Sequence, residues 1–321
     1  MPSTPDVSVV IPTWSRPDLV TRAARGALAQ THDAIEVIVV IDGPDDETRA
    51  MLANIGDPRL RVIGLPDQGG APNARNVGVL EAQAPWTAFL DDDDEWLAHK
   101  LEVQFGLAKG ARVAMPIVAS RLLNRTPRAE FVMPRRLPAP GEPLSEYLTV
   151  RRGLFYGDGF IQTSTIMAPT DLLRRVPFDV GLRRQQELDW TLRAVRHDDV
   201  DLIIAEEPLV IWHQDENRQR ISLSMPWESQ LEWLRANREL FTPRAYAAFT
   251  MSVISSMAAP TRSPRVFREL LREARGHGRP RVLDYLTFLQ IWAIPPQLRR
   301  GLRDAVLGRR RAKRAIGRPA A

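Results

Sequence analysis

The chain has 321 residues, of which 44% are hydrophobic, and it contains no cysteine. This length and composition allow a well-buried core, in one large domain with an appendage or in two modest domains. The lack of cysteine excludes disulfides, thiolate metal sites and cysteine nucleophiles. The first residues show no basic segment followed by a long apolar one, and no run of about 18 apolar residues occurs, so neither a secretory signal nor a membrane-spanning helix is predicted.

The formal net charge is +5, but the cations are concentrated at the C-terminus. Residues 295–321 carry nine arginines or lysines and one acid, a net +8, which leaves −3 on residues 1–294. A nucleic-acid-binding body is therefore not favoured. The apolar run Arg281–Ile294 precedes the basic segment. This pair is typical of peripheral attachment to an anionic membrane surface, with a solvated basic end as the alternative.

Strand-like and helix-like segments alternate over the first hundred residues. Four apolar runs predict buried strands: Val7–Ile11, Ile35–Ile41, Leu60–Leu65 and Trp86–Leu90. Helices are predicted between them: Arg16–Gln30, Asp46–Asn54 and Asn76–Gln83. This alternation predicts an α/β fold with a mostly parallel central sheet and helices on both faces.

The remaining chain has a looser pattern followed by a helical one. Strands are predicted at Arg112–Ser120, Ile161–Ala168 and Leu209–Trp212, and a helix at Gln185–Arg196. From Pro226 on, apolar periodicity predicts further helices: Trp227–Leu240, Pro243–Met257, Ser263–Gly276 and Arg281–Ile294. We therefore expect a nucleotide-binding domain over residues 1–222 and a helical region with a basic tail over residues 223–321.

Polar clusters follow the first, second and fourth predicted strands, at the edge of the sheet where ligands of open α/β folds bind. The last cluster is Asp91-Asp92-Asp93-Asp94. Four adjacent carboxylates repel one another, and a hard cation such as Mg²⁺ or Mn²⁺, shared with substrate phosphates, would neutralise them. The alternative is a solvated loop in which Asp94 caps the following helix.

Four blocks together resemble the inverting family 2 glycosyltransferases of the GT-A fold. They are VSVVIPTWSRPDLVTRAARGALAQT, IEVIVVIDGPDDET, GGAPNARNVGV and WTAFLDDDDEWLAHKLE. The resemblance covers about the first hundred residues and continues more faintly to about Arg220. It implies transfer of a sugar from a nucleotide-sugar donor, with UDP the default nucleotide, assisted by Mn²⁺ or Mg²⁺.

The resemblance also implies roles for single residues. The pair Pro12 and Thr13 would line the base and ribose pocket, and Asp42 would accept hydrogen bonds from the base. Arg75 would approach the base or the diphosphate. In the Asp-x-Asp motif, Asp91 with Asp92 would face the donor and Asp93 would hold the metal. Two of these residues have plain alternatives: Asp42 could simply begin a turn, and Arg75 could be an exposed helix residue.

Inversion needs a carboxylate that accepts the proton of the acceptor hydroxyl. Similar transferases take this base from an acidic pair that opens a helix, and the matching residues here are Gln186-Glu187-Leu188-Asp189-Trp190. The match favours Glu187, whereas a shift of two residues would make Asp189 the base; a surface acid at a helix start is the third possibility. His213, after a predicted strand, would complete the metal or diphosphate site or be structural.

The sequence therefore predicts a cytoplasmic, metal-dependent inverting glycosyltransferase of cell-surface glycan or glycolipid synthesis. Its partners would be a nucleotide-sugar, a glycan or lipid-linked acceptor, and an anionic membrane surface bound through the basic tail. One alternative is a sugar nucleotidyltransferase, but that class places a glycine-rich basic loop after the first strand, where this chain has Ile11-Pro12-Thr13-Trp14-Ser15. Another is a non-enzymatic membrane or nucleic-acid adaptor.

Overall fold

The computed structural model describes residues 4–127, 129–154, 157–214 and 226–315. The chain forms two compact units. The sheet unit contains Met1–Asn124 and Ile161–His213, and the helical unit contains Arg125–Phe160 and Gln214–Ala321. The predicted domain boundary at residues 222 and 223 lies outside the described residues. Residues 125–160 group with the C-terminal helices, although they precede the last part of the sheet unit in the chain.

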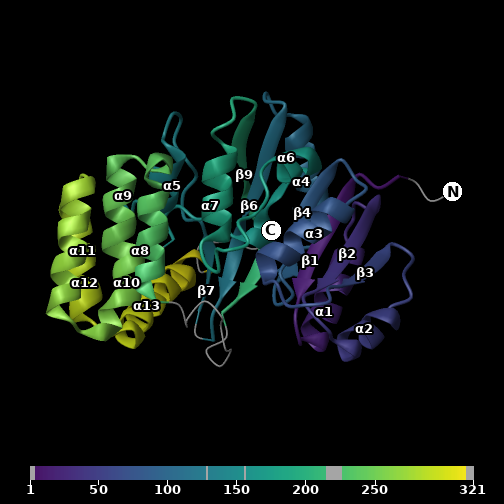
Figure 1. Cartoon of the computed structure of the whole chain (residues 1–321), viewed down its shortest axis with the longest axis horizontal. Helices are drawn as coiled ribbons and strands as arrows, with labels where there is room; N and C mark the ends of the chain where they lie inside the picture. Colours follow the sequence, from purple (N-terminus) through teal and green to yellow (C-terminus); the bar gives the residue numbers. More distant parts are fainter. Residues whose placement is uncertain (1–3, 128, 155–156, 215–225, 316–321) are drawn as a thin grey trace. The chain divides into compact units, whose positions relative to one another are not determined.

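The first half of the sheet unit is a parallel βα repeat (Figure 1). Its strands are β1 (Val7–Thr13), β2 (Ile35–Ile41), β3 (Leu60–Gly64) and β4 (Trp86–Phe89). The helices are α1 (Pro17–Leu28), α2 (Asp46–Ala53) and α3 (Ala71–Glu81). Every residue of β1 and β2 is buried, as expected for strands covered on both faces. The strand order β3-β2-β1-β4 reverses direction after β3, so right-handed crossovers place α1 and α2 on one face and α3 on the other.

The second half of the sheet is antiparallel. Its strands are β5 (Glu95–Trp96), β6 (Met115–Arg125), β8 (Met167–Pro169) and β9 (Val200–His213). The order continues from β4 as β8-β6-β9-β5, and β8 is antiparallel to both β4 and β6. Three helices and a 3₁₀ turn complete the unit: α4 (Lys100–Lys109), η1 (Thr163–Thr165), α6 (Thr170–Arg175) and α7 (Gln186–Ala194).

The predicted strands and helices of the first hundred residues are all present; β2 has the predicted bounds, and the other elements differ from the prediction at one end or both. Helix α3 begins at Ala71, five residues before the predicted start, because Pro72 occupies its first turn, where proline is favoured. Strand β9 begins at Val200, whereas the prediction began at Leu209. Of the predicted strand Ile161–Ala168, only Met167 and Ala168 lie in a strand, β8, since Thr163–Thr165 forms a 3₁₀ turn.

The helical unit combines a short strand, β7 (Glu130–Met133), with α5 (Leu144–Thr149) and the C-terminal helices. These are α8 (Trp227–Ala236), α9 (Pro243–Phe249), α10 (Ser255–Ala258), α11 (Pro264–His277), α12 (Val282–Ala293) and α13 (Pro296–Ala315). A π-helical turn over Thr250–Ile254 joins α9 to α10. Helix α13 was not predicted. Among the described helices, none combines the length and the apolar character that crossing a bilayer requires.

Candidate active site

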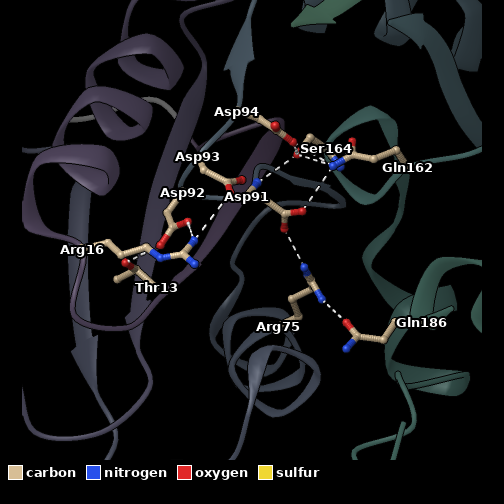
Figure 2. A network of polar contacts seen from close by, with 10 residues as sticks. All are labelled: Thr13, Arg16, Arg75, Asp91, Asp92, Asp93, Asp94, Gln162, Ser164 and Gln186. Carbon is tan, nitrogen blue, oxygen red and sulfur yellow. Dashed lines mark hydrogen bonds and ion pairs between the residues drawn. The ribbon is translucent and has the colours of Figure 1, made fainter. Parts of the chain in front are cut away.

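The four aspartates that follow β4 are divided by burial into two pairs. Asp92 and Asp94 are buried, whereas the side chains of Asp91 and Asp93 are 25% and 28% exposed. The parallel strands β1, β2 and β4 end at one edge of the sheet, so the residues after them lie together there. Figure 2 shows the resulting polar network. Two carboxylates are therefore used inside the protein, and two remain accessible to a ligand.

Asp92 ties the acidic loop to the end of β1 and the start of α1. Its carboxylate accepts hydrogen bonds from Thr13 Oγ1 at 2.8 Å and from Arg16 Nη1 at 3.0 Å. Burial raises the pKa of Asp92 to about 6; the Arg16 charge opposes this rise and the neighbouring Asp93 adds to it. Thr13, assigned to the base pocket, is itself buried and serves this contact.

Asp94 ties the same loop to the segment around η1. Its carboxylate accepts hydrogen bonds from Ser164 Oγ at 2.6 Å and Gln162 Nε2 at 2.7 Å. Ser164 Oγ in turn accepts from the backbone N–H of Asp91 at 3.0 Å. Burial, followed by the charges of Asp93 and Asp91, holds the pKa of Asp94 well above its usual range. These contacts make Asp94 a structural support of the loop.

Asp93 lies beside two arginines: Arg16, the N-cap residue of α1, and Arg22, within α1. Its Oδ2 is 3.5 Å from Arg16 Nη1, and its backbone carbonyl accepts a hydrogen bond from Arg22 Nη2 at 3.0 Å. His213, predicted to complete the metal or diphosphate site, has Glu95 as its partner: its Nε2 lies 2.9 Å from Glu95 Oε1. Arg22 is also near Glu95, at 3.5 Å.

The accessible carboxylates, Asp91 and Asp93, could supply only some of the ligands that a divalent cation needs. Within the described parts of the chain, no three acidic or histidine side chains converge as ligands. Mg²⁺ and Mn²⁺ prefer oxygen ligands, and Mg²⁺ is usually held by one or two carboxylates together with substrate phosphates and water. Asp93, with Asp91 beside it, matches that smaller requirement. A cation here would depend on a bound diphosphate for its remaining ligands.

Arg75 of α3 connects the acidic loop to the start of α7. Its Nη2 is 2.5 Å from Asp91 Oδ1, and its Nη1 donates to Gln186 Oε1 at 2.6 Å. The residue is only 4% exposed, and its guanidinium lies 5.8 Å from the ring centre of Phe178. The Nε atom of Arg75 has no partner among the described residues. Arg75 is therefore a buried bridge, and the alternative of an exposed helix residue does not apply.

Asp42, at the end of β2, holds the loop that leads into α3. Its two carboxylate oxygens accept the backbone N–H groups of Gly69 and Gly70, each at 2.8 Å. Gly70 has φ +86°, a conformation that favours glycine. Pro12 lies buried within β1, paired with Val40 of β2. Trp14, directly after β1, is 45% exposed and offers an aromatic face at this edge.

Helix α7 carries both candidate bases, in different surroundings. Asp189 is 2% exposed and forms an ion pair with Arg193, at 2.6 Å between Oδ2 and Nη2. Glu187 is half-buried, and its carboxylate accepts a hydrogen bond from a backbone N–H of its own residue. Burial raises the pKa of Glu187, against the opposing charge of Arg75. The two acids of α7 therefore differ: the pKa of Glu187 is raised by burial, whereas Asp189 is paired with Arg193.

The position of α7 is set by contacts from α3 and from the segment before α7. Asn76 exchanges two hydrogen bonds of 2.9 Å with the backbone of Phe178. Trp190 donates its indole N–H to the Val176 carbonyl at 2.7 Å and stacks on Phe178, with ring centres 5.5 Å apart. Adjacent residues of α3 thus hold both ends of this segment, Arg75 at Gln186 and Asn76 at Phe178.

The structure brings together Thr13, Arg75, the four aspartates and Gln186 of the predicted motif, and it adds three residues that the sequence did not single out: Arg16, Gln162 and Ser164 (Figure 2). Arg16 had a readable signal. An arginine at the N-cap of α1, where the helix dipole disfavours a cation, calls for an acidic partner. The neutral residues Gln162 and Ser164 had no comparable signal.

Comparisons with known proteins identify the family of this chain. The family model "Glycosyl transferase family 2" matches residues 8–165, which include the acidic loop and η1. The chain is 32% identical over 198 residues to the putative colanic acid biosynthesis glycosyl transferase WcaA of Escherichia coli, covering 61% of this chain and 68% of WcaA. The chain belongs to glycosyl transferase family 2. The predicted family resemblance is therefore confirmed.

Another relative is the succinoglycan biosynthesis protein ExoO of Rhizobium meliloti, 39% identical over 113 residues that cover 35% of this chain and 32% of ExoO. The chain spans only 32% to 58% of the length of several curated relatives. Among solved structures, S. aureus TarS 1-349 in complex with UDP has a TM-score of 0.51 at 15% identity, covering 92% of this chain and 91% of that chain. This likeness supports the predicted α/β fold of GT-A type with C-terminal helices.

Proposed function

We propose that this family 2 member is a metal-dependent inverting glycosyltransferase that moves a sugar from a nucleotide-sugar, by default a UDP-sugar, to a hydroxyl of a glycan or lipid-linked glycan. One observation carries the proposal. A single sheet edge presents the partly exposed carboxylates of Asp91 and Asp93, and Arg75 joins Asp91 to the start of α7, where Glu187 lies.

In the proposed reaction, the acceptor oxygen attacks the anomeric carbon while the bond from that carbon to the diphosphate breaks. The hydroxyl proton passes to the Glu187 carboxylate, and the nucleoside diphosphate leaves with the bonding electron pair. Asp189 holds Arg193 within α7 and does not take the proton. Arg75 positions Gln186 and, through it, the first turn that contains Glu187.

The donor would bind at the carboxyl ends of β1, β2 and β4. A Mn²⁺ or Mg²⁺ ion held by Asp93 would supply electrostatic stabilisation of the departing diphosphate. Asp42 shapes the Gly69–Gly70 loop on one side of this edge, and the exposed face of Trp14 can stack on a base. Two of the TarS structures are complexes with UDP and with UDP-GlcNAc, which supports UDP as the nucleotide.

The cellular role proposed here is synthesis of a cell-surface glycan, at the cytoplasmic side of a membrane. It is supported by the names of the family 2 relatives, which refer to succinoglycan and colanic acid biosynthesis. The acceptor would accordingly be a growing glycan, free or lipid-linked.

The proposal is tested by release of nucleoside diphosphate from UDP-, GDP- and dTDP-sugars, with water as the acceptor, by the full chain in Mn²⁺ or in EDTA. We expect release from one nucleotide class, dependent on Mn²⁺ and lost in Asp93→Asn. Asp171→Asn is the matched control, because Asp171 is 80% exposed on α6, which follows a strand antiparallel to β4 and so starts at the opposite edge. Equal release by Asp93→Asn and Asp171→Asn would disprove the proposed site.

A further inference from the structure

Exposed large apolar side chains are concentrated in one short stretch of the helical unit. Of the eleven that the described residues contain, six lie between residues 282 and 306, on α12 and α13. Those on α12 are Val282, Leu286 and Leu289, and those on α13 are Leu298, Leu302 and Val306. Scattered single apolar residues are normal on a protein surface, but a concentration of this kind marks a surface that binds something.

Helix α13 is amphipathic with its faces inverted. Leu298, Leu302 and Val306, at helical spacing along one face, are 62%, 52% and 41% exposed. Arg303 and Asp304, by contrast, have side chains only 17% and 11% exposed and form an ion pair at 2.8 Å. A helix that packed on its own core would bury the leucines and expose the charges.

The inward face of α13 is fixed by contacts within the helical unit. The Arg303 guanidinium lies 5.3 Å from the ring centre of Phe131 on β7. Burial lowers the pKa of Arg299, one turn earlier, with the charge of Arg300 as a second cause. These contacts hold the charged face against the protein, so the apolar face points outward.

The positive charge near this apolar face indicates what binds there. Residues 295–321 carry a net +8, and much of it follows Val306 directly in the sequence. A second copy of this chain would bring the same positive charge to the interface, whereas a surface of anionic lipids offers apolar tails beneath opposite charge.

We propose that α13 is a membrane-docking helix that lies in the plane of an anionic lipid surface, with Leu298, Leu302 and Val306 inserted among the acyl chains. The net charge of +8 over residues 295–321 attracts this part of the chain to the anionic headgroups. The charged inward face keeps α13 on the helical unit, so the helix docks the whole enzyme. This inference does not depend on the proposed reaction, because docking requires neither donor nor acceptor.

The test is flotation of the full chain with vesicles of phosphatidylcholine alone or with 30% phosphatidylglycerol. The wild-type chain is expected to float only with the anionic vesicles, and less as salt increases. The variant L298S/L302S/V306S is expected to bind at least ten-fold more weakly. The variant R309Q/R310Q/R311Q should lose about a hundred-fold, since each cation contributes up to about five-fold near an anionic surface.

Leu80→Ser is the matched control, because Leu80 is 68% exposed on α3 of the sheet unit and should not affect flotation. Melting curves of all variants establish that they are folded. The inference is overturned if L298S/L302S/V306S floats like the wild type, or if the wild type floats equally with neutral vesicles. It is also overturned if no vesicles are bound and sedimentation velocity shows a dimer that this triple variant abolishes.

Discussion

Glu187 and Asp189 lie two residues apart on α7, but isosteric replacement of each should affect a different quantity: kcat for Glu187 and stability for Asp189. Glu187→Gln is expected to lower kcat by roughly 10² to 10⁴, the usual contribution of a general base, without loss of stability. Because burial raises the pKa of Glu187, the fold disfavours its ionised form at neutral pH. A neutral glutamine at this position should therefore leave the unfolding free energy unchanged or increase it.

Asp189→Asn is expected to act mainly on stability. The Asp189 side chain is 3% exposed and its ion pair with Arg193 is short, so the lost charge leaves a partly buried arginine without its counter-ion. Loss of a fully buried ion-pair partner costs about 3 to 5 kcal/mol. Arg193 is 27% exposed and keeps its bond to the Pro177 carbonyl, so we expect about 2 kcal/mol, or a melting temperature lower by roughly 5 °C.

The assay is donor turnover of both variants between pH 4 and 8, with chemical denaturation in parallel. In the wild type, kcat should fall as pH decreases through a pKa above the ordinary 4.5 of glutamate, because the base must be ionised to accept the proton. The reasoning is refuted if Asp189→Asn is folded but inactive while Glu187→Gln keeps more than a tenth of the wild-type kcat.

Two further substitutions probe the acidic loop and its bridge. Asp92→Asn should stabilise the metal-free protein above pH 6 by up to about 3 kcal/mol and have little effect near pH 4, because a folded-state pKa of about 6 against an ordinary 3.8 makes ionised Asp92 destabilising once pH exceeds both values. Denaturant titrations across this pH range check it, and a loss of stability at pH 7.5 would contradict it. Arg75→Lys keeps the charge, but a lysine cannot bond both Asp91 and Gln186. We expect the free energy of unfolding to fall by about 1 to 3 kcal/mol, and kcat to decrease by a larger factor than KM changes. Unchanged kcat in the folded variant would remove Arg75 from the positioning of Glu187.

The parallel half of the sheet could be predicted from sequence because β1 and β2 are buried along their whole length and so consist of β-branched and apolar residues. Strand β9 was predicted too short, since the part before Leu209 is partly exposed and includes Glu206, Glu207 and Pro208. Such residues are typical of a loop. Here backbone pairing with neighbouring strands, which the sequence does not reveal, decides the structure.

Helix α13 was missed for a related reason. Its arginines gave the sequence the character of a solvated tail, whereas Arg303 and Asp304 are held against β7. At the site, the sequence predicted which residues are acidic and functional, but not which side chains form hydrogen bonds with each of them. The sequence identified Asp91 to Asp94 as a group, but only the fold assigns Asp92 to Thr13 and Arg16, and Asp94 to Gln162 and Ser164. The partners lie up to 79 residues from the aspartates along the chain, beyond any local pattern.

Calorimetric titration of UDP into the full chain, with and without Mn²⁺, tests most directly whether Asp93 joins a cation to a donor diphosphate. We expect Mn²⁺ to tighten UDP binding at least ten-fold in the wild type and to have no effect in Asp93→Asn, with Asp171→Asn behaving as the wild type. If UDP binds equally well in EDTA, and Asp93→Asn binds it with the same Kd and the same response to Mn²⁺ as the wild type, then the acidic loop is not where the donor diphosphate is neutralised.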